Sequence, residues 1–339
     1  MNNNNIFYID ATTIGEGGGY ILLEYIANFL IENEQKHLIF CNERIETKLK
    51  NITASVKKPS FKELIKLYTT GFKDKTLFFC NRGPIFHNKH CSVYIHSEYA
   101  TLSFREIYNL DTRICRKLIH FFTYILNFTS ARISKNKFLV QTQHMRGKLF
   151  KKRGINSQTL PFFPKIVALK KINREFDYCY ISFPWPHKNF QLLLSTLLTP
   201  DFSNVKLKIA VTIPTEKRFD HILQIIDKIN SSTKHYVHNF GSVEKKYIPE
   251  IYSKSKAALF LSSKESFGIP LIEAAQLKIP ILAPNLPYAQ EILQGYYPVS
   301  ISDPEIFRHE LKKYSQLLFS GDLQPPKLVI NNRISDLIY

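Results

Sequence analysis

Residues 256–293 read KAALFLSSKESFGIPLIEAAQLKIPILAPNLPYAQEIL, and this stretch decides the fold. Its apolar runs and helical spacing indicate a buried strand, a short loop, a helix and a second strand. Gly268 lets the backbone approach a ligand closely, and Pro270 suits the first position of a helix. Since the free N–H groups at a helix N-terminus attract phosphate, the stretch predicts an α/β unit with an anion-binding loop. Two carboxylates flank that loop, Glu265 at its start and Glu273 inside the helix.

The rest of the second half continues this alternation of strands and helices. Pro161 and Pro164 punctuate the chain, and the pattern restarts with a strand at 176–183, so we place a domain boundary near Pro164. Further elements follow at regular intervals. Strands are predicted at 206–212, 237–240, 257–262 and 280–283, and helices at 189–198, 219–230 and 270–277.

The first half opens with the same kind of unit. An apolar run at 6–10 leads into a glycine-rich turn at 15–19, and apolar residues then recur at helical spacing up to Ile31. This order is strand, glycine loop and helix. Further strands are predicted, in chain order, at 37–41, 76–80, 92–96 and 137–141. Parallel strands joined by helical crossovers form an open α/β sheet.

The chain length indicates how these elements are organised. At 339 residues the chain exceeds the size at which one hydrophobic core keeps growing, so we expect two domains and room for a cleft between them. The hydrophobic share of 44% and the charged share of 22% are those of a globular protein, which excludes disorder and collagen-like chains. We expect an N-terminal α/β domain at 1–164, a C-terminal α/β domain at 165–320 and a tail at 321–339, with packing of the tail on the N-terminal domain as one option.

The charge balance predicts an anionic partner. Lys and Arg number 46 against 28 Asp and Glu, a net charge of +18 that attracts nucleic acid, anionic lipid or a phosphorylated substrate. The positive residues are spread along the chain, which favours a membrane surface over a nucleic-acid groove. The segment 104–128 is basic and amphipathic, and we interpret it as a core-packed helix or helix pair in preference to an interfacial membrane helix.

Targeting signals and cysteines point to the cytoplasm. No stretch of the sequence reaches the ~18 apolar residues that a membrane span needs, and the start MNNNNIFYID lacks the pattern of a signal peptide. The five cysteines form no CxxC pair and are odd in number, so we expect neither a disulfide framework nor a zinc site.

The central stretch carries a resemblance to a known family. Glu265 and Glu273 enclose the seven residues SFGIPLI and are followed by AA. This pattern resembles the E-x7-E signature of the family 4 retaining glycosyltransferases. The resemblance implies the GT-B fold, which consists of two facing Rossmann-like domains with the active site in the cleft between them.

Three more segments resemble the same family, in its order. GGGYILLEYIANFL at 17–30 is similar to its glycine loop and following helix, VYIHSEYA at 93–100 to its strand that ends in a histidine, and YISFPWPHKNFQLLL at 180–194 to the opening of its second domain. The stretch 239–263 also resembles the segment that precedes the signature and flanks the nucleobase. One position departs from the pattern, because Phe183 stands where many members carry an arginine.

The resemblance implies a role for each matching residue. His96, Lys188 and Glu265 would be the catalytic residues, with His96 at the transferred sugar, Lys188 at the diphosphate and Glu265 at hydroxyls of the donor sugar. Glu273 would accept hydrogen bonds from the ribose hydroxyls. The residues implied in donor binding are Gly17, Gly18, Lys188, Ser266, Phe267, Gly268 and Glu273.

The expected activity is that of a retaining hexosyltransferase that needs no metal and no cofactor. The sequence contains no Asp-x-Asp, the pattern that holds a divalent cation on the diphosphate in other glycosyltransferases. A nucleotide-diphosphate sugar would be the donor. The acceptor would be a saccharide linked to polyprenyl diphosphate, and the enzyme would act in O-antigen or capsule biosynthesis at the anionic inner face of the cell membrane.

Two other classes of function stay open. A GT-B-type sugar-nucleotide epimerase or phosphorylase would use the same architecture, although the sequence offers no lysine motif for pyridoxal phosphate. The other alternative is a non-enzymatic basic protein that binds nucleic acid or anionic membrane. Zinc spacing and an RNP-like aromatic motif are both absent from the sequence, so we expect no nucleic-acid partner.

Overall fold

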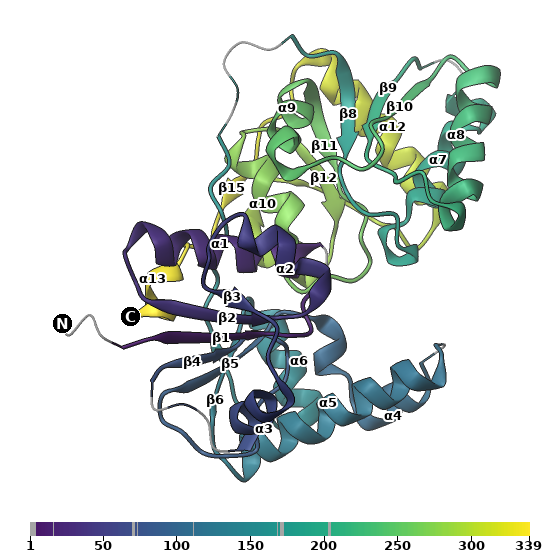
Figure 1. The fold of residues 1–339 in the computed structure, drawn as a ribbon. Helices are drawn as coiled ribbons and strands as arrows, with labels where there is room; N and C mark the ends of the chain where they lie inside the picture. The colour runs from purple at the N-terminus through teal and green to yellow at the C-terminus, as the bar shows by residue number, and fades with distance from the viewer. Residues whose placement is uncertain are drawn as a thin grey trace. The chain divides into compact units, whose positions relative to one another are not determined.

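The computed structural model describes residues 5–15, 17–69, 72, 74–110, 112–167, 169, 173–202 and 205–339. The chain divides into two compact units. The first contains Met1–Pro164 together with Asn331–Tyr339, and the second contains Lys165–Ile330. Each unit is an α/β structure built on a parallel sheet (Figure 1), so the predicted fold class, two Rossmann-like domains, is confirmed.

The first unit has a seven-stranded parallel sheet in the order β3-β2-β1-β4-β5-β6-β7. Its strand order grows from β1 in both directions, because β2 and β3 lie on one side of β1 and β4 lies on the other. The strand order therefore reverses between β1 and β4, which makes this place the topological switch point of the sheet. Open α/β sheets bind ligands at the carboxyl ends of the strands beside such a switch point. The strands are β1 (Phe7–Ala11), β2 (His37–Cys41), β3 (Val56–Lys57), β4 (Thr76–Phe78), β5 (Cys91–Ile95), β6 (Lys137–Val140) and β7 (Gln158–Thr159).

Helices cover this first sheet. Helix α1 buries Leu22, Ile26 and Leu30, the apolar positions whose spacing predicts a helix after the glycine loop. Helix α13, at the end of the chain, packs beside α1 (Figure 1). The helices of this unit are α1 (Gly18–Glu32), α2 (Glu43–Lys50), α3 (Phe61–Thr69), α4 (Phe104–Tyr108), α5 (Ile114–Arg132), α6 (Gln143–Arg153) and α13 (Ile334–Ile338).

The interpretation of 104–128 as a core-packed segment is wrong. It forms the pair α4 and α5, which projects beyond the sheet in Figure 1, and most of its large apolar side chains are exposed. The buried side of α5 is instead made of smaller and polar residues such as Asn127 and Ser130. On this side the backbone of Gly83 approaches α5 closely, since a Cβ added there would lie 2.3 Å from Ser130 Oγ. The exposed apolar residues of the pair are Phe104, Tyr108, Ile114, Leu118, Ile119, Phe122, Ile125 and Phe128.

The second unit has a six-stranded parallel sheet in the order β10-β9-β8-β11-β12-β14. Strand β8 is the first of this unit, β9 and β10 extend the sheet on one side, and β11 pairs with β8 on the other. The switch point of this sheet therefore lies between β8 and β11. The strands are β8 (Phe176–Tyr180), β9 (Lys208–Val211), β10 (Tyr236–Asn239), β11 (Ser255–Leu259), β12 (Ile281–Pro284) and β14 (Tyr297–Val299), and β13 (Leu293–Gln294) pairs separately with β15 (Lys327–Leu328).

Local sequence explains where the helices of the second unit begin. Gly268 adopts the left-handed conformation with φ of 75° immediately before α10, and Asp303 caps α12 by accepting hydrogen bonds from the N–H groups of Glu305 and Ile306. No helix in the described part of either unit is long and apolar enough to cross a membrane. The helices of the second unit are α7 (Phe190–Leu197), α8 (Asp220–Ser232), α9 (Ile248–Ser253), α10 (Ile269–Gln276), α11 (Pro287–Ile292) and α12 (Pro304–Ser320).

Candidate functional site

Two of the predicted catalytic residues meet at the switch point of the second unit. Lys188 follows the carboxyl end of β8 and Glu265 follows that of β11, and their side chains form an ion pair. Only 12% of the Lys188 side chain and 14% of the Glu265 side chain are exposed. The Lys188 ammonium also lies 4.9 Å from the centre of the Phe260 ring. The sheet topology thus brings together two opposite charges that are distant in the sequence.

Two hydrogen bonds hold the segment around Lys188 against the loop that leads to Glu265. The Ser263 N–H donates to the His187 carbonyl at 2.8 Å. The Asn189 side chain donates to the Leu261 carbonyl at 2.8 Å, and Asn189 itself has a left-handed φ of 54°. Asparagine tolerates this conformation better than most residues, which explains the HKN sequence at the end of the short turn Pro186–Lys188.

The loop after Glu265 leads directly into α10. Phe267 is buried and Gly268 is in the left-handed region, where a Cβ would lie 3.2 Å from Leu271 Cδ1. Pro270 lies in the first turn of α10, which begins at Ile269, one residue before the predicted start. Ser266, Phe267 and Gly268 therefore lie at the positive end of a helix dipole, close in sequence to the Lys188–Glu265 ion pair.

Glu273 lies in the second turn of α10 and is buried, with 7% of its surface exposed. Tyr252 donates to its carboxylate at 3.4 Å and to the Pro270 carbonyl at 3.1 Å. Burial raises the pKa of Glu273 to about 7, while Lys245 and the Tyr252 hydroxyl act in the opposite direction. The carboxyl group of Glu273 consequently changes its charge near neutral pH.

Phe183 belongs to an aromatic cluster that holds a cation the sequence reasoning missed. The guanidinium of Arg218 lies 5.2 Å from the Phe183 ring, 5.1 Å from the Trp185 ring and 4.8 Å from the Phe219 ring. Its Nη2 also forms an ion pair with Glu216 at 2.7 Å. Arg218 lies in the segment that follows β9, the strand that pairs with β8. Phe183, which stands where the family has an arginine, thus contacts an arginine from that neighbouring segment. The EKRF sequence gives no signal for this arrangement.

The first unit brings the glycine loop close to His96. Gly17 has a φ of 101° and precedes α1, whose first residue is Gly18. At Gly19 an added Cβ would lie 2.9 Å from His96 Cε1, so only glycine fits there without a shift. Gly17, Gly18 and His96 therefore lie near the carboxyl ends of β1 and β5, on the two sides of β4.

Surrounding side chains hold His96 in one orientation. Its ring stacks on Phe79 with centroids 4.6 Å apart, and Nε2 lies 2.9 Å from Asn81 Nδ2 and 3.1 Å from the Phe79 carbonyl. Burial lowers the pKa of His96 to about 4, with hydrogen bonding acting against this shift, so the ring is neutral at pH 7. The sequence gives no signal for Asn81, because its left-handed φ of 60° shortly after β4, which is typical of a functional loop, is seen only in the structure.

A buried polar network supports the loop that follows β1. The Asp10 carboxylate accepts hydrogen bonds from the Thr12 hydroxyl at 2.7 Å, from the Tyr68 hydroxyl at 2.6 Å and from the Cys80 thiol at 3.0 Å. Burial and the Asp10 charge raise the pKa of Cys80 to about 12. The network ties β1 to β4 directly beneath the glycine loop.

Comparison with known proteins identifies the second unit. The sequence model of the family described as glycosyl transferases group 1 matches residues 169–329, a range that contains Lys188, Glu265 and Glu273. The serotype-specific mannosyltransferase WbdA of Escherichia coli is 42% identical over 55 residues, which are 16% of this chain and 7% of WbdA. The O-antigen chain mannosyltransferase RfbU of Salmonella typhimurium is 25% identical over 150 residues, which are 44% of this chain and 41% of RfbU. The chain thus aligns with less than half the length of either relative.

The architecture is also that of solved glycosyltransferase structures. The structure of HepE from Anabaena in complex with UDP and glucose matches with a TM-score of 0.62 at 11% identity, over 94% of this chain and 91% of HepE. At that identity the likeness concerns the fold, which is GT-B. The family match over the second unit, the two O-antigen mannosyltransferase relatives and this fold lead to one conclusion. Residues 169–329, nearly all of the second unit, resemble the group 1 glycosyl transferases.

Proposed function

We propose that this protein is a retaining hexosyltransferase that moves a sugar from a nucleotide-diphosphate donor to a saccharide acceptor in cell-surface polysaccharide biosynthesis. The observation that carries the proposal is the Lys188–Glu265 ion pair at the switch point of the second unit, beside the N-terminus of α10. Open α/β sheets bind nucleotides at this place. The names of WbdA and RfbU, which describe mannosyltransferases, favour a hexose, and the neighbour HepE binds UDP and glucose.

The positive groups of the site suit the leaving diphosphate. Negative charge builds on the leaving oxygen when the bond to the anomeric carbon breaks, and preorganised positive groups lower that barrier most. Lys188 contributes its ammonium and the N-terminus of α10 contributes its dipole. Arg218, held by three aromatic rings, adds a second positive charge where Phe183 replaces the expected arginine.

The carboxylates and the histidine bind the rest of the donor in this proposal. Glu273, in its ionised form, accepts hydrogen bonds from the ribose hydroxyls. The positive groups that bind the diphosphate favour this ionised form near neutral pH. Glu265 binds hydroxyls of the transferred sugar. His96 is neutral, so it acts as a hydrogen-bond donor to the sugar, and Gly17 and Gly18 offer backbone N–H groups to the phosphates.

The acceptor hydroxyl attacks from the face of the leaving group, so the anomeric configuration is retained. The departing phosphate takes the proton of the acceptor, and no side chain acts as the nucleophile. We propose that the reaction needs neither a metal nor a cofactor, since the sequence contains no Asp-x-Asp to hold a cation on the diphosphate.

The α4–α5 pair suits docking on an anionic membrane, which supports a lipid-linked acceptor. Its exposed apolar side chains lie among the basic residues Arg105, Arg113, Arg116 and Lys117. A helix with exposed apolar residues and interspersed Lys or Arg binds at the interface of a membrane that contains anionic lipid. In this proposal the enzyme is cytoplasmic and peripheral on the inner face of the membrane, where a saccharide linked to polyprenyl diphosphate is the acceptor.

Donor binding tests the proposal directly. Purified protein is titrated with UDP-, GDP-, ADP- and dTDP-sugars in EDTA, and donor hydrolysis is followed in parallel. We expect saturable binding of one donor, weakened by Lys188→Gln and by Arg218→Gln. Lys312→Gln, which removes an exposed lysine of α12 in the same unit, is the control and should leave binding unchanged. A protein that binds none of the donors, with or without added Mg²⁺, would overturn the proposed function.

A further inference from the structure

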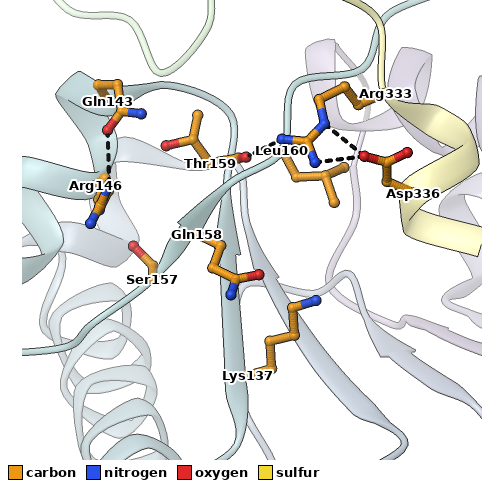
Figure 2. Close-up of a pocket in the computed structure, with 9 residues that line it drawn as sticks. All are labelled: Lys137, Gln143, Arg146, Ser157, Gln158, Thr159, Leu160, Arg333 and Asp336. Carbon is orange, nitrogen blue, oxygen red and sulfur yellow. Dashed lines mark hydrogen bonds and ion pairs between the residues drawn. The ribbon is translucent and has the colours of Figure 1, made fainter.

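A pocket of about 390 Å³ opens in the first unit, at the edge of its sheet. Its walls are edge strand β7 with the adjoining Ser157 and Leu160, the start of α6, and α13. Figure 2 shows Gln143 and Arg146 at one end of the pocket, Arg333 and Asp336 at the other, and the segment from Ser157 to Leu160 between them. All of these residues belong to the first unit, so the pocket is complete within it.

The charges around the pocket are mainly positive. Lys137, Arg146 and Arg333 line it together with one carboxylate, Asp336. Arg333 already pairs with that carboxylate, through Nε at 2.7 Å and Nη2 at 2.6 Å. Arg146 Nη1 donates to the neutral Gln143 side chain, to Oε1 at 3.3 Å. Two cations therefore face the pocket in excess of the single carboxylate, which favours an anionic occupant.

Two hydroxyl groups on the pocket wall point to a specific occupant. Ser157 is only 9% exposed, and among the described residues neither its Oγ nor Thr159 Oγ1 has a hydrogen-bond partner. Buried hydroxyl groups without a partner are costly and are normally satisfied by a ligand or by water. Figure 2 shows the Ser157 hydroxyl on the side of the strand where Arg146 lies. An oxyanion at this place would satisfy the hydroxyl groups and the guanidinium together.

Helix α6 adds a third feature. It spans 11 residues from Gln143 to Arg153, and its first residue lines the pocket. The positive end of its dipole therefore lies at the pocket wall, where a negative charge is stabilised.

We infer that this pocket binds a phosphate group, carried by a small polar molecule such as a sugar phosphate. The volume exceeds what a single phosphate fills and lies within the range of ligand pockets, while the lining is polar apart from Leu160. The phosphate contacts Arg146, Ser157 and the N-terminus of α6, and Lys137 and Gln158 face the remainder of the ligand. All of its lining residues belong to the first unit, and the inference does not depend on the proposed function.

Calorimetric titration of the protein, with both units present, tests this inference with three ligands: inorganic phosphate, glucose 1-phosphate and neutral glucose. We expect saturable binding of glucose 1-phosphate, weaker binding of phosphate and none of glucose. Arg146→Gln should weaken glucose 1-phosphate binding by about tenfold or more, since a hydrogen bond to a charged group is lost. Ser157→Ala should weaken it several-fold. Lys312→Gln, an exposed lysine of α12 in the second unit, serves as the control.

Each possible result of the titrations either supports or overturns the phosphate site. Equal affinity for phosphate and glucose 1-phosphate would identify free phosphate as the occupant and would retain the phosphate site. Binding that Arg146→Gln and Ser157→Ala leave unchanged would place the anion elsewhere and overturn the inference, as would the absence of binding by either phosphate compound. Because Arg146 is exposed and Ser157→Ala only removes a hydroxyl group, both variants should fold, which thermal unfolding checks.

Discussion

The side chain of Asn81 contacts both the backbone N–H and the ring of His96. The Asn81 side-chain oxygen accepts from the His96 N–H at 2.7 Å and from the Ser97 N–H at 2.9 Å, and Asn81 Nδ2 lies 2.9 Å from His96 Nε2. Because Asn81 Oδ1 accepts hydrogen bonds from these two backbone N–H groups, Asn81 Nδ2 faces the His96 ring. His96 Nε2 thus faces the Asn81 amide donor and also the Phe79 carbonyl, an acceptor 3.1 Å away, while Nδ1 is the ring nitrogen nearer the glycine loop.

Asn81→Asp should raise the pKa of His96. The substitution replaces the Nδ2 donor by a carboxylate oxygen beside Nε2, and an opposite charge at this distance stabilises the imidazolium by roughly 1–3 pKa units. The pKa of His96 should therefore rise from about 4 to above 5, measured by NMR titration of the His96 Cε1 proton. Aspartate also tolerates the left-handed φ of 60°. A pKa that stays near 4 would show that Asn81 does not set the protonation of this ring.

The Lys188–Glu265 ion pair should behave as a coupled unit. Lys188→Met leaves a largely buried carboxylate unpaired, and breaking such a pair costs about 3 kcal/mol of the free energy of unfolding. The double variant Lys188→Met, Glu265→Leu removes both charges and should recover most of that loss. Urea unfolding of the protein measures the free energy of unfolding that is lost in Lys188→Met, in Glu265→Leu and in the double variant. If the losses of the two single variants simply add in the double variant, the charges are not coupled.

Stability should depend on the protonation of Glu273. Its pKa rises from 4.5 to about 7 on folding, so the native state binds an additional proton between these values. The corresponding stability is fully present below pH 4.5 and is lost as the pH rises through 7. Glu273→Gln stays neutral at every pH, so above pH 8 its free energy of unfolding should exceed that of the native protein by up to about 3 kcal/mol.

A pH series of denaturant unfolding measures this difference. Glu250→Gln, at a more exposed glutamate of the same unit, is the control and should follow the native pH dependence. A Glu273→Gln variant with the same pH dependence as the native protein would contradict the burial of a titrating carboxyl at this position.

Phe122→Ser should reduce binding to membranes without changing stability. Phe122 lies on the apolar side of α5 and is 53% exposed, so its loss leaves the core intact but removes apolar area that the proposed docking would bury. Phe319→Ser is the matched control, because Phe319 is 50% exposed and lies in the second unit. Sedimentation with vesicles that contain anionic lipid, at low salt, measures retention. Equal retention of the two variants would exclude α5 as the docking surface.

The sequence alone predicts the sheets well because their strands are continuous apolar runs. The predicted strand at 37–41 coincides with β2, and the helix after the glycine loop buries the predicted residues. Strand β14 was missed, since Tyr297–Val299 is three residues long and contains a proline. The apolar pattern of 104–128 correctly predicts helices, but periodicity does not reveal whether the apolar side meets a core or remains exposed.

The candidate site was predicted residue by residue, but its contacts were not. Lys188 and Glu265 matched separate motifs, and their 77-residue separation gives no indication that the two side chains form an ion pair. Asn81 and Arg218 escaped prediction for a similar reason. The role of Asn81 depends on a left-handed backbone, and that of Arg218 on three rings contributed by two segments. Such relationships arise from tertiary structure.

The last nine residues also affect how the protein folds during synthesis. Ile334, Leu337 and Ile338 of α13 are buried in the first unit, Arg333 N donates to the Pro161 carbonyl at 2.9 Å, and Lys75 donates to the Ile338 carbonyl at 2.9 Å. The domain translated first is thus completed by residues that are translated after the second domain. While the ribosome produces the 166 residues of Lys165–Ile330, the first domain must remain without its closing helix, so a nascent chain cut before Asn331 should stay vulnerable to proteolysis around α1.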